Sequence, residues 1–309
     1  METNERTIAW LMEGDPSIRW QVMRDLLDLP ADRWQSVRTR SAEDGWVRRF
    51  LDLQDPVGTW GGGIYSPKWT STTYTLLTLI DCGVDASNSV AKRGAEQILL
   101  RGIGRGNVDG KLGSLVSNDV CVWGFYLNIA AYFRLESPML SELCALLIRE
   151  QMGDGGWNCR RLREKSVHHS SFHTTFNVLD GLREAARAEW IDSKTFLESE
   201  GRAMEFMLQH RMYRSDRTGE IVNAHFTEFS YPPRWHYDVL RGLDYIRSTP
   251  FARDTRLADA IDLVRQRGPT GIWPAQNRHP GKFHFAMEAA PRQSRWNTLR
   301  ALRVLKACG

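Results

Sequence analysis

Residues 118–123, with the sequence NDVCVW, place a carboxylate, Asp119, two positions before a thiol, Cys121. Carboxylate and thiolate are both ligands that Zn²⁺ accepts in proteins, so the pair is a candidate for binding one ion. Residues two positions apart do not share a face of a helix. We therefore expect chelation only if Asp119 stands at the helix N-cap, outside the helix. The alternative is that Asp119 caps the helix and Cys121 packs in the core.

A second group of potential metal ligands lies in residues 154–173. It consists of a carboxylate, a thiol and three imidazoles: Asp154, Cys159, His168, His169 and His173. This group lacks the tight paired spacing that is typical of a structural zinc site. It is therefore the weaker of the two candidate ligand sets.

His236 and Asp238 are the candidates for acid–base chemistry. We expect both in the first turn of a helix, where the helix dipole favours the neutral form of histidine and suits it to act as a base. The alternative is a histidine that is hydrogen-bonded at the rim of the fold. The sequence contains no nucleophile elbow, phosphate loop or dinucleotide fingerprint.

A repeat of about fifty residues organises the chain, in which a Gly-x-apolar turn precedes each apolar helix except the first. The turns begin at Gly58, Gly113, Gly155, Gly219 and Gly271. Helices rich in apolar residues are predicted at 15–27, 66–79, 117–133, 170–182, 232–246 and 293–305. Amphipathic helices are predicted between them, at 5–13, 34–53, 90–100, 141–152, 192–209 and 255–267. No segment reads as a run of strands.

Alternation of apolar and amphipathic helices indicates an inner and an outer layer, because a helix that is apolar all round must be buried. The prediction is an all-α fold in which residues 1–309 form one domain, an (α/α)6 toroid of six helical hairpins. An open superhelix of hairpins is the alternative. A chain of 309 residues is long for one domain, but closed architectures reach this size.

Inner helices of such a toroid run parallel, so their N-termini, with their partial positive charges, gather at one mouth. A cation precedes a tryptophan near four of these starts, in Arg19-Trp20, Lys68-Trp69, Arg234-Trp235 and Arg295-Trp296. This pattern suits a small amphiphile with an anionic head and an apolar tail. The predicted substrate-binding residues are Trp69, Trp123, Arg234, Trp235, Tyr237, Arg295 and Trp296. The alternative is that the tryptophans pack the hairpins together and the cations are solvated.

The Gln-x3-Gly-x-Trp turns that begin at Gln54 and Gln151 resemble the squalene cyclase repeat of the terpenoid cyclases. The DVC sequence at Asp119 and the FHT sequence around His173 resemble the β-subunits of protein prenyltransferases. The resemblance covers most of the chain and implies an (α/α)6 toroid. It also implies that Asp119, Cys121 and His173 hold a catalytic zinc ion, beside an isoprenoid substrate.

The sequence departs from both families at their other functional motifs. Only Lys111 provides a basic residue shortly before Asp119, and Val122 stands where the prenyltransferases have a tyrosine that helps to bind diphosphate. The acidic Asp-x-Asp-Asp motif of the class II terpene cyclases is missing. Neither family's chemistry is therefore carried over intact.

Composition and charge disfavour several classes of protein. The net charge of +4 comes from interspersed charges, which disfavours nucleic-acid binding. No stretch approaches the roughly 18 to 20 apolar residues of a membrane span. The first residues lack a signal-peptide core, and five scattered cysteines indicate reduced thiols and a cytoplasmic protein.

The leading hypothesis is a prenyltransferase-like or cyclase-like enzyme that acts on an isoprenoid or lipid-like ligand, with zinc as cofactor. One alternative is a non-catalytic toroid that binds a ligand or a protein at its mouth. The other is a metal-dependent hydrolase or lyase that uses His236 on a polar substrate. The sequence does not specify a partner subunit.

Overall fold

The structure, a computed structural model, describes residues 5–104, 119–161, 163–164, 166–277, 279–288 and 293–309. Within these ranges the chain is helical, and the only β-structure is two isolated bridges, Trp60 with Gly63 and Arg214 with Ile221. This confirms the all-α prediction. None of the described helices is both long and apolar enough to cross a membrane. The turn at Gly113 and the basic residue Lys111 lie outside the described residues.

The chain divides into two compact units. The first comprises residues 1–52, 82–84 and 207–309, and the second comprises residues 53–81 and 85–206. The first unit contains α1 (Glu5–Met12), α2 (Pro16–Asp25), α3 (Ala31–Arg40), α4 (Gly45–Leu51), α11 (Val239–Ile246), α12 (Ala258–Arg267) and α13 (Arg295–Cys308). The second contains α6 (Ser89–Gln97), α7 (Val120–Tyr132), α8 (Pro138–Arg149), α9 (Phe172–Arg187) and most of α5 (Thr72–Cys82) and α10 (Ser193–Gln209).

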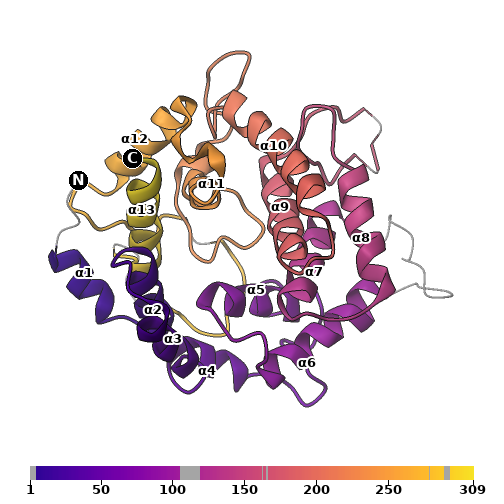
Figure 1. Ribbon diagram of the computed structural model, residues 1–309, viewed down its shortest axis with the longest axis vertical. Coiled ribbons are helices and arrows are strands. Elements are labelled where there is room, and N and C mark those ends of the chain that lie inside the picture. The colour runs from indigo at the N-terminus through magenta and orange to yellow at the C-terminus, as the bar shows by residue number, and fades with distance from the viewer. Residues whose placement is uncertain (1–4, 105–118, 162, 165, 278, 289–292) are drawn as a thin grey trace. The chain divides into compact units, whose positions relative to one another are not determined.

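Helices α7 and α9 lie side by side in the second unit (Figure 1). Glycine permits their close approach. A Cβ atom on Gly124 would lie 2.4 Å from the carbonyl oxygen of Asn177, and one on Gly181 would lie 2.4 Å from the carbonyl oxygen of Gly124. Any larger side chain at these positions would push the two backbones apart. The glycines therefore fix how α7, which carries Cys121, packs against α9.

The two Gln-x3-Gly-x-Trp turns of the second unit make the same contacts. The side-chain amides of Gln54 and Gln151 donate to the carbonyl oxygens of the motif glycines, at 3.2 and 2.6 Å. Both glycines have positive φ angles, +90° at Gly58 and +103° at Gly155. The motif tryptophans are fully buried. The backbone N–H of each donates to a threonine hydroxyl near the start of the following helix, Trp60 to Thr72 and Trp157 to Thr175, both at 3.1 Å. The repeat seen in the sequence is therefore a repeat of structure.

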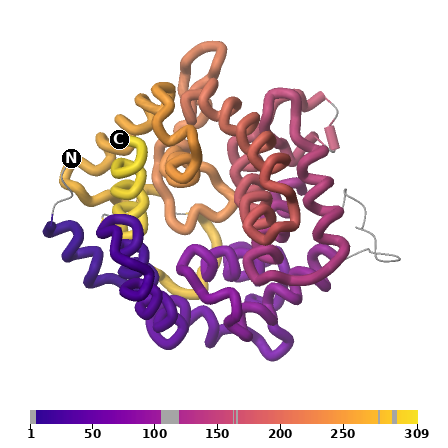
Figure 2. The backbone as a smooth tube through the Cα atoms, in the orientation of Figure 1, coloured from indigo at the N-terminus to yellow at the C-terminus, as the bar shows by residue number. Residues whose placement is uncertain are grey.

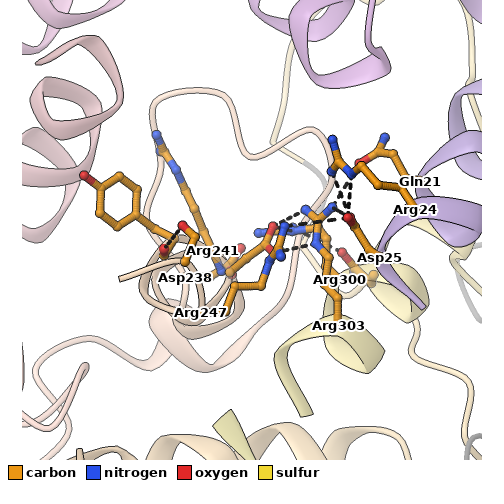
Figure 3. A network of polar contacts seen from close by, with 12 residues as sticks. Gln21, Arg24, Asp25, Asp238, Arg241, Arg247, Arg300 and Arg303 are labelled. Carbon is orange, nitrogen blue, oxygen red and sulfur yellow. Dashed lines mark hydrogen bonds and ion pairs between the residues drawn. The ribbon is translucent and has the colours of Figure 1, made fainter. Parts of the chain in front are cut away.

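In the first unit, the last helix of the chain lies beside one of its first. Figure 2 shows α13 close to α2, and ion pairs join them. Arg303 of α13 contacts Asp25 of α2 at 3.3 Å and also binds Asp244 of α11. Figure 3 shows Arg303 beside Asp25, which also pairs with Arg24.

Within this network, one carboxylate, that of Asp244, faces three guanidinium groups. Burial alone would raise the pKa of Asp244, but the guanidinium groups of Arg303, Arg247 and Arg300 outweigh burial and hold the pKa well below its usual range. The side chain of Asp244 is 14% exposed. A carboxylate so enclosed is costly to leave without its partners. The network therefore ties α2, α11 and α13 together.

Three predicted helices differ most from the observed ones. The helix expected at 34–53 is two helices, α3 and α4, because the backbone turns at Gly45 with a φ angle of +76°. The helix expected at 66–79 begins only at Thr72, so Trp69 precedes it. The helix expected at 232–246 begins at Val239. His236 and Asp238 are therefore not in its first turn, which corrects the prediction.

Candidate metal centre

Asp119 stands at the N-cap of α7, with φ −68° and ψ 146°. Its side chain makes no capping hydrogen bond. Asp119 therefore has the N-cap position that chelation requires. Its side chain does not cap the helix, contrary to the alternative expectation. The carboxylate instead contacts the guanidinium of Arg163 at 2.5 Å, in a half-exposed ion pair.

Cys159 is held against the same helix end by the second Gln-x3-Gly-x-Trp turn. It follows the buried Trp157 by two residues, and its N–H donates to the hydroxyl of Thr174 at 3.4 Å. The thiol sulfur accepts hydrogen bonds from the Thr174 hydroxyl at 3.2 Å and from the backbone N–H of Cys121 at 3.3 Å. Because Sγ of Cys159 contacts the first turns of both α7 and α9, these two helices start at the same end.

The ligand atoms of Asp119, Cys121 and Cys159 lie within 4.8 Å of one another. The ligand atoms of a tetrahedral zinc site lie about 3.3–3.8 Å apart, given bond lengths of about 2.0–2.3 Å. Metal binding would draw these three atoms from within 4.8 Å of one another to that spacing. Two thiolates and a carboxylate form a donor set that suits Zn²⁺, and three protein ligands leave a fourth position open. The residues present therefore fit a zinc ion.

Hydrogen bonding makes the two sulfur atoms unequal. The thiol of Cys121 donates to Sγ of Cys159, which lowers the pKa of Cys159 and raises that of Cys121. The Thr174 hydroxyl lowers the pKa of Cys159 further, and burial raises that of Cys121 further. Cys159 is therefore the sulfur that carries negative charge more readily. Burial, together with the nearby Cys121, Asp119 and Cys159, also raises the pKa of Tyr65 to about 12.

The observed triad combines the two candidate ligand sets. Asp119 and Cys121 come from the first set and Cys159 from the second. His173 is described, and it directly precedes Thr174 on α9, but its imidazole is not among the ligand atoms of this cluster. The sequence signal for Cys159 is its place two residues after the motif tryptophan, which the ligand spacing did not reveal.

The remaining members of the second set lie outside the cluster. Asp154 accepts from the N–H and the hydroxyl of Ser170, at 2.7 and 2.5 Å, and so ties the turn to the segment before α9. The carbonyl oxygen of His169 accepts from the Asn158 amide at 2.8 Å. These contacts stabilise the loop that carries Cys159. Neither His168 nor His169 belongs to the cluster.

Aromatic side chains of the second unit form a group close to the triad. Phe125 lies one helical turn after Cys121 on α7, and its ring is 6.1 Å from that of Tyr74. Tyr74 packs edge-on against Trp69 at 4.8 Å and donates to the hydroxyl of Tyr65 at 3.0 Å. These contacts place Trp69, a predicted substrate-binding residue, in an aromatic cluster. The cluster begins on the face of α7 that carries Cys121.

Trp123, the other predicted substrate-binding residue of the second unit, is buried. Its Nε1 atom has no hydrogen-bond partner among the described residues. A buried indole N–H usually finds an acceptor, so this donor is available to a polar atom from outside the described residues.

The other predicted site residues belong to the first unit. Asp238 is the N-cap of α11, and its carboxylate accepts from the N–H of Arg241 at 2.8 Å and of Ser230 at 3.2 Å. His236 stacks between Trp235 and a histidine that the sequence did not single out, His279, with ring centroids 3.7 and 3.8 Å away. Asp238 therefore has a capping role in α11.

Packing accounts for the rest of this group. Tyr237 is buried and donates to the carbonyl oxygen of Met212 at 2.6 Å. Trp296 stacks on Tyr231 at 4.1 Å. The guanidinium of Arg295 lies over the ring of Trp10, and that of Arg234 over Phe283. These contacts give Tyr237, Trp296, Arg295 and Arg234 packing partners within the first unit.

Comparisons of the chain with models of protein families, with curated proteins and with solved structures found no match.

Proposed function

We propose that the chain binds zinc through Asp119, Cys121 and Cys159 and acts as an enzyme on a lipid-like, isoprenoid substrate. The observation that carries the proposal is the approach of three suitable ligand atoms to within 4.8 Å at the start of α7. Zinc held by three protein ligands supplies Lewis acidity at its open position. A candidate for a fourth ligand is the imidazole of His173, because His173 directly precedes Thr174, whose hydroxyl donates to Sγ of Cys159.

The proposed architecture is the (α/α)6 toroid of six hairpins. Its support is the structural identity of the turns at Gly58 and Gly155, together with the common starting end of α7 and α9. A third turn, in the first unit, has the same device: the N–H of Trp273 donates to the hydroxyl of Thr298 at 3.0 Å. Equivalent turns that lead into α5, α9 and α13 are what a ring of hairpins would require.

The proposed substrate class rests on the aromatic cluster that adjoins the triad. Phe125, Tyr74 and Trp69 are buried rings packed against one another, and aromatic faces and edges of this kind suit an unsaturated hydrocarbon or a developing carbocation. The Nε1 atom of Trp123, which has no partner in the described part of the chain, would donate to a polar atom of the same ligand. The chain's own residues would thus hold the apolar part of the substrate and exclude water beside the ion.

Elemental analysis of protein purified without added metal tests the metal centre. We expect close to one equivalent of zinc, lost from Cys121→Ala and from Cys159→Ala but retained in Cys144→Ala, a buried cysteine outside the triad. Less than about a tenth of an equivalent in the wild type, after refilling with zinc, would refute the site. Circular dichroism of each variant shows whether the helices remain.

Mass spectrometry of lipid extracted from the purified protein tests the substrate class. We expect a bound isoprenoid in wild-type protein and less of it in Trp69→Ala. A polar ligand in its place would contradict the isoprenoid assignment. Zinc and lipid without turnover of isoprenoid diphosphates or alcohols would favour the non-catalytic binding protein.

A further inference from the structure

The two sulfur atoms of the triad are placed to react with each other. Cys121 and Cys159 are 38 residues apart in the sequence, yet their Sγ atoms lie within 4.8 Å. Both side chains are half-buried, whereas Cys82, Cys144 and Cys308 are buried. A small oxidant therefore has access to this pair. We propose that Cys121 and Cys159 form a reversible disulfide that controls metal binding.

This inference rests on the proposed zinc site only for its regulatory consequence, because the disulfide itself needs no metal. The local contacts assign a different role to each sulfur. Sγ of Cys159 accepts hydrogen bonds from the N–H of Cys121 and the hydroxyl of Thr174, and it lies at the N-terminus of α7. These donors stabilise negative charge on sulfur, so Cys159 is the nucleophile. Cys121, beside it, is the resolving thiol.

The oxidant is a hydroperoxide, with hydrogen peroxide as the simplest case. The Cys159 thiolate attacks one peroxide oxygen, the O–O bond breaks, and the departing hydroxide takes up a proton to give water. Cys159 is then a sulfenic acid. The Cys121 sulfur attacks it, the S–S bond forms, the S–O bond breaks, and the second hydroxide combines with the Cys121 proton. In sum, two thiols and one peroxide give one disulfide and two waters.

Closure requires the sulfur atoms to approach to about 2.05 Å. The segment that carries Cys159 can make this movement because none of the described residues between Trp157 and the start of α9 at Phe172 lies in a regular helix. Trp157 itself stays anchored, by its N–H on Thr175 and by its indole N–H on the carbonyl oxygen of Leu147. The motion is therefore confined to the loop.

Oxidation and metal binding exclude each other at this site. A disulfide sulfur is no longer a thiolate, so the oxidised pair keeps only the Asp119 carboxylate as a zinc ligand. Conversely, zinc bound by both thiolates lowers their reactivity toward peroxide. Zinc release and disulfide formation thus accompany each other, and a dithiol reductant reverses both.

Peptide mapping of metal-free, reduced protein after hydrogen peroxide treatment tests the disulfide. We expect one dominant linked pair, the tryptic peptides that contain Cys121 and Cys159, in the wild type and in Cys144→Ser. In Cys121→Ser, a cyclic 1,3-diketone should trap sulfenic acid on Cys159. If Cys121 is labelled in Cys159→Ser while Cys159 stays unlabelled in Cys121→Ser, the assigned roles are overturned. Absence of the linked pair in the wild type overturns the proposal.

Zinc protection separates this inference from the proposed function. We expect the zinc-loaded protein to form the disulfide at least about tenfold more slowly than the metal-free protein. Linked peptides from a protein that binds no zinc would uphold the disulfide and refute the metal centre. A protein that binds zinc but forms no linked pair when metal-free would do the reverse. Equal oxidation rates with and without bound zinc would overturn the regulatory consequence.

Discussion

Arg163 competes with a metal ion for the carboxylate of Asp119, so its removal should tighten zinc binding. The guanidinium and the carboxylate are 2.5 Å apart, with side chains 56% and 39% exposed. Coulomb's law in bulk water gives about 1.7 kcal/mol for unit charges at this distance. Exposed pairs contribute less, about 0.2–1 kcal/mol, because water screens them and side-chain entropy opposes them. Zinc must displace this pair to reach the carboxylate.

The substitution is Arg163→Met, which retains an unbranched side chain and removes the charge. We expect the zinc dissociation constant to fall about 1.4- to 5-fold, the ratio that corresponds to about 0.2–1 kcal/mol. Competition with a chromophoric chelator measures it. The difference between variant and wild type should shrink between about 10 mM and about 1 M salt, as the Debye length falls from about 30 to about 3 Å.

Arg160→Met is the matched control, since Arg160 lies on the same loop but pairs with Glu164 at 2.5 Å and not with Asp119. It should leave zinc affinity within about twofold of the wild type, because it frees no ligand. Zinc affinity that is unchanged or weaker in Arg163→Met at low salt would refute the competition. An equal gain in both variants would mean that net charge, and not the ion pair, sets the effect.

Three further predictions concern stability and pH. Asp244→Asn should cost about 3–5 kcal/mol in urea unfolding, because it leaves buried guanidinium groups without their acceptor, whereas Asp28→Asn, at an exposed ion pair, should stay within about 0.5 kcal/mol. Because the pKa of Asp244 is lowered in the folded state, its contribution is complete above about pH 4 and is lost as pH falls further, so the gap to Asp244→Asn should narrow in acid. Gly155→Ala should destabilise the protein by at least about 2 kcal/mol, since its Cβ would lie 2.3 Å from the carbonyl oxygen of Arg202 at a φ angle of +103°; Gly153→Ala, with nothing near its Cβ, should stay within about 0.5 kcal/mol. Zinc affinity should weaken as pH falls, by up to about tenfold per pH unit for each proton displaced. The reason is that the pKa of Cys121 is raised, so zinc must displace the proton of this thiol. A zinc affinity that stays constant between about pH 6 and about pH 8 would contradict thiolate ligation by Cys121.

Local sequence patterns predicted the helices well where the deciding interactions are local. Apolar periodicity and capping residues depend on neighbours within a few positions, so α7, α9 and α13 were predicted within a few residues of their observed bounds. The start of α11 was wrong because the apolar pattern extends through Trp235 and Tyr237, which are outside the helix. Asp238 followed by an apolar run is a common N-cap signal, and it gives the correct start.

The metal ligands depend on contacts that spacing along the chain does not encode. Asp119 and Cys121 are local, and the requirement for an N-cap position followed from helix geometry alone. Cys159 joins them from 38 residues away through two hydrogen bonds, which no periodicity reports. The ligand set in residues 154–173 was ranked below Asp119 and Cys121 because its members lack tight paired spacing along the chain. Spacing ranks chelates within one segment and carries no information about a ligand that a neighbouring loop supplies.

Cys159 owes its position to a motif that the chain repeats for a structural purpose. In each turn the motif tryptophan is buried and its N–H binds a threonine of the next helix, which fixes the path of the following residues. Two residues beyond the tryptophan stand Gly62 in the first turn, Cys159 in the second and Ala275 in the third. The scaffold is thus common to all three turns, and only one carries a thiol. Cys159→Gly should therefore abolish zinc binding and leave the fold intact, because the equivalent position after Trp60 is already a glycine. A Cys159→Gly protein that unfolds in the absence of metal would show instead that the thiol belongs to the packing of the turn.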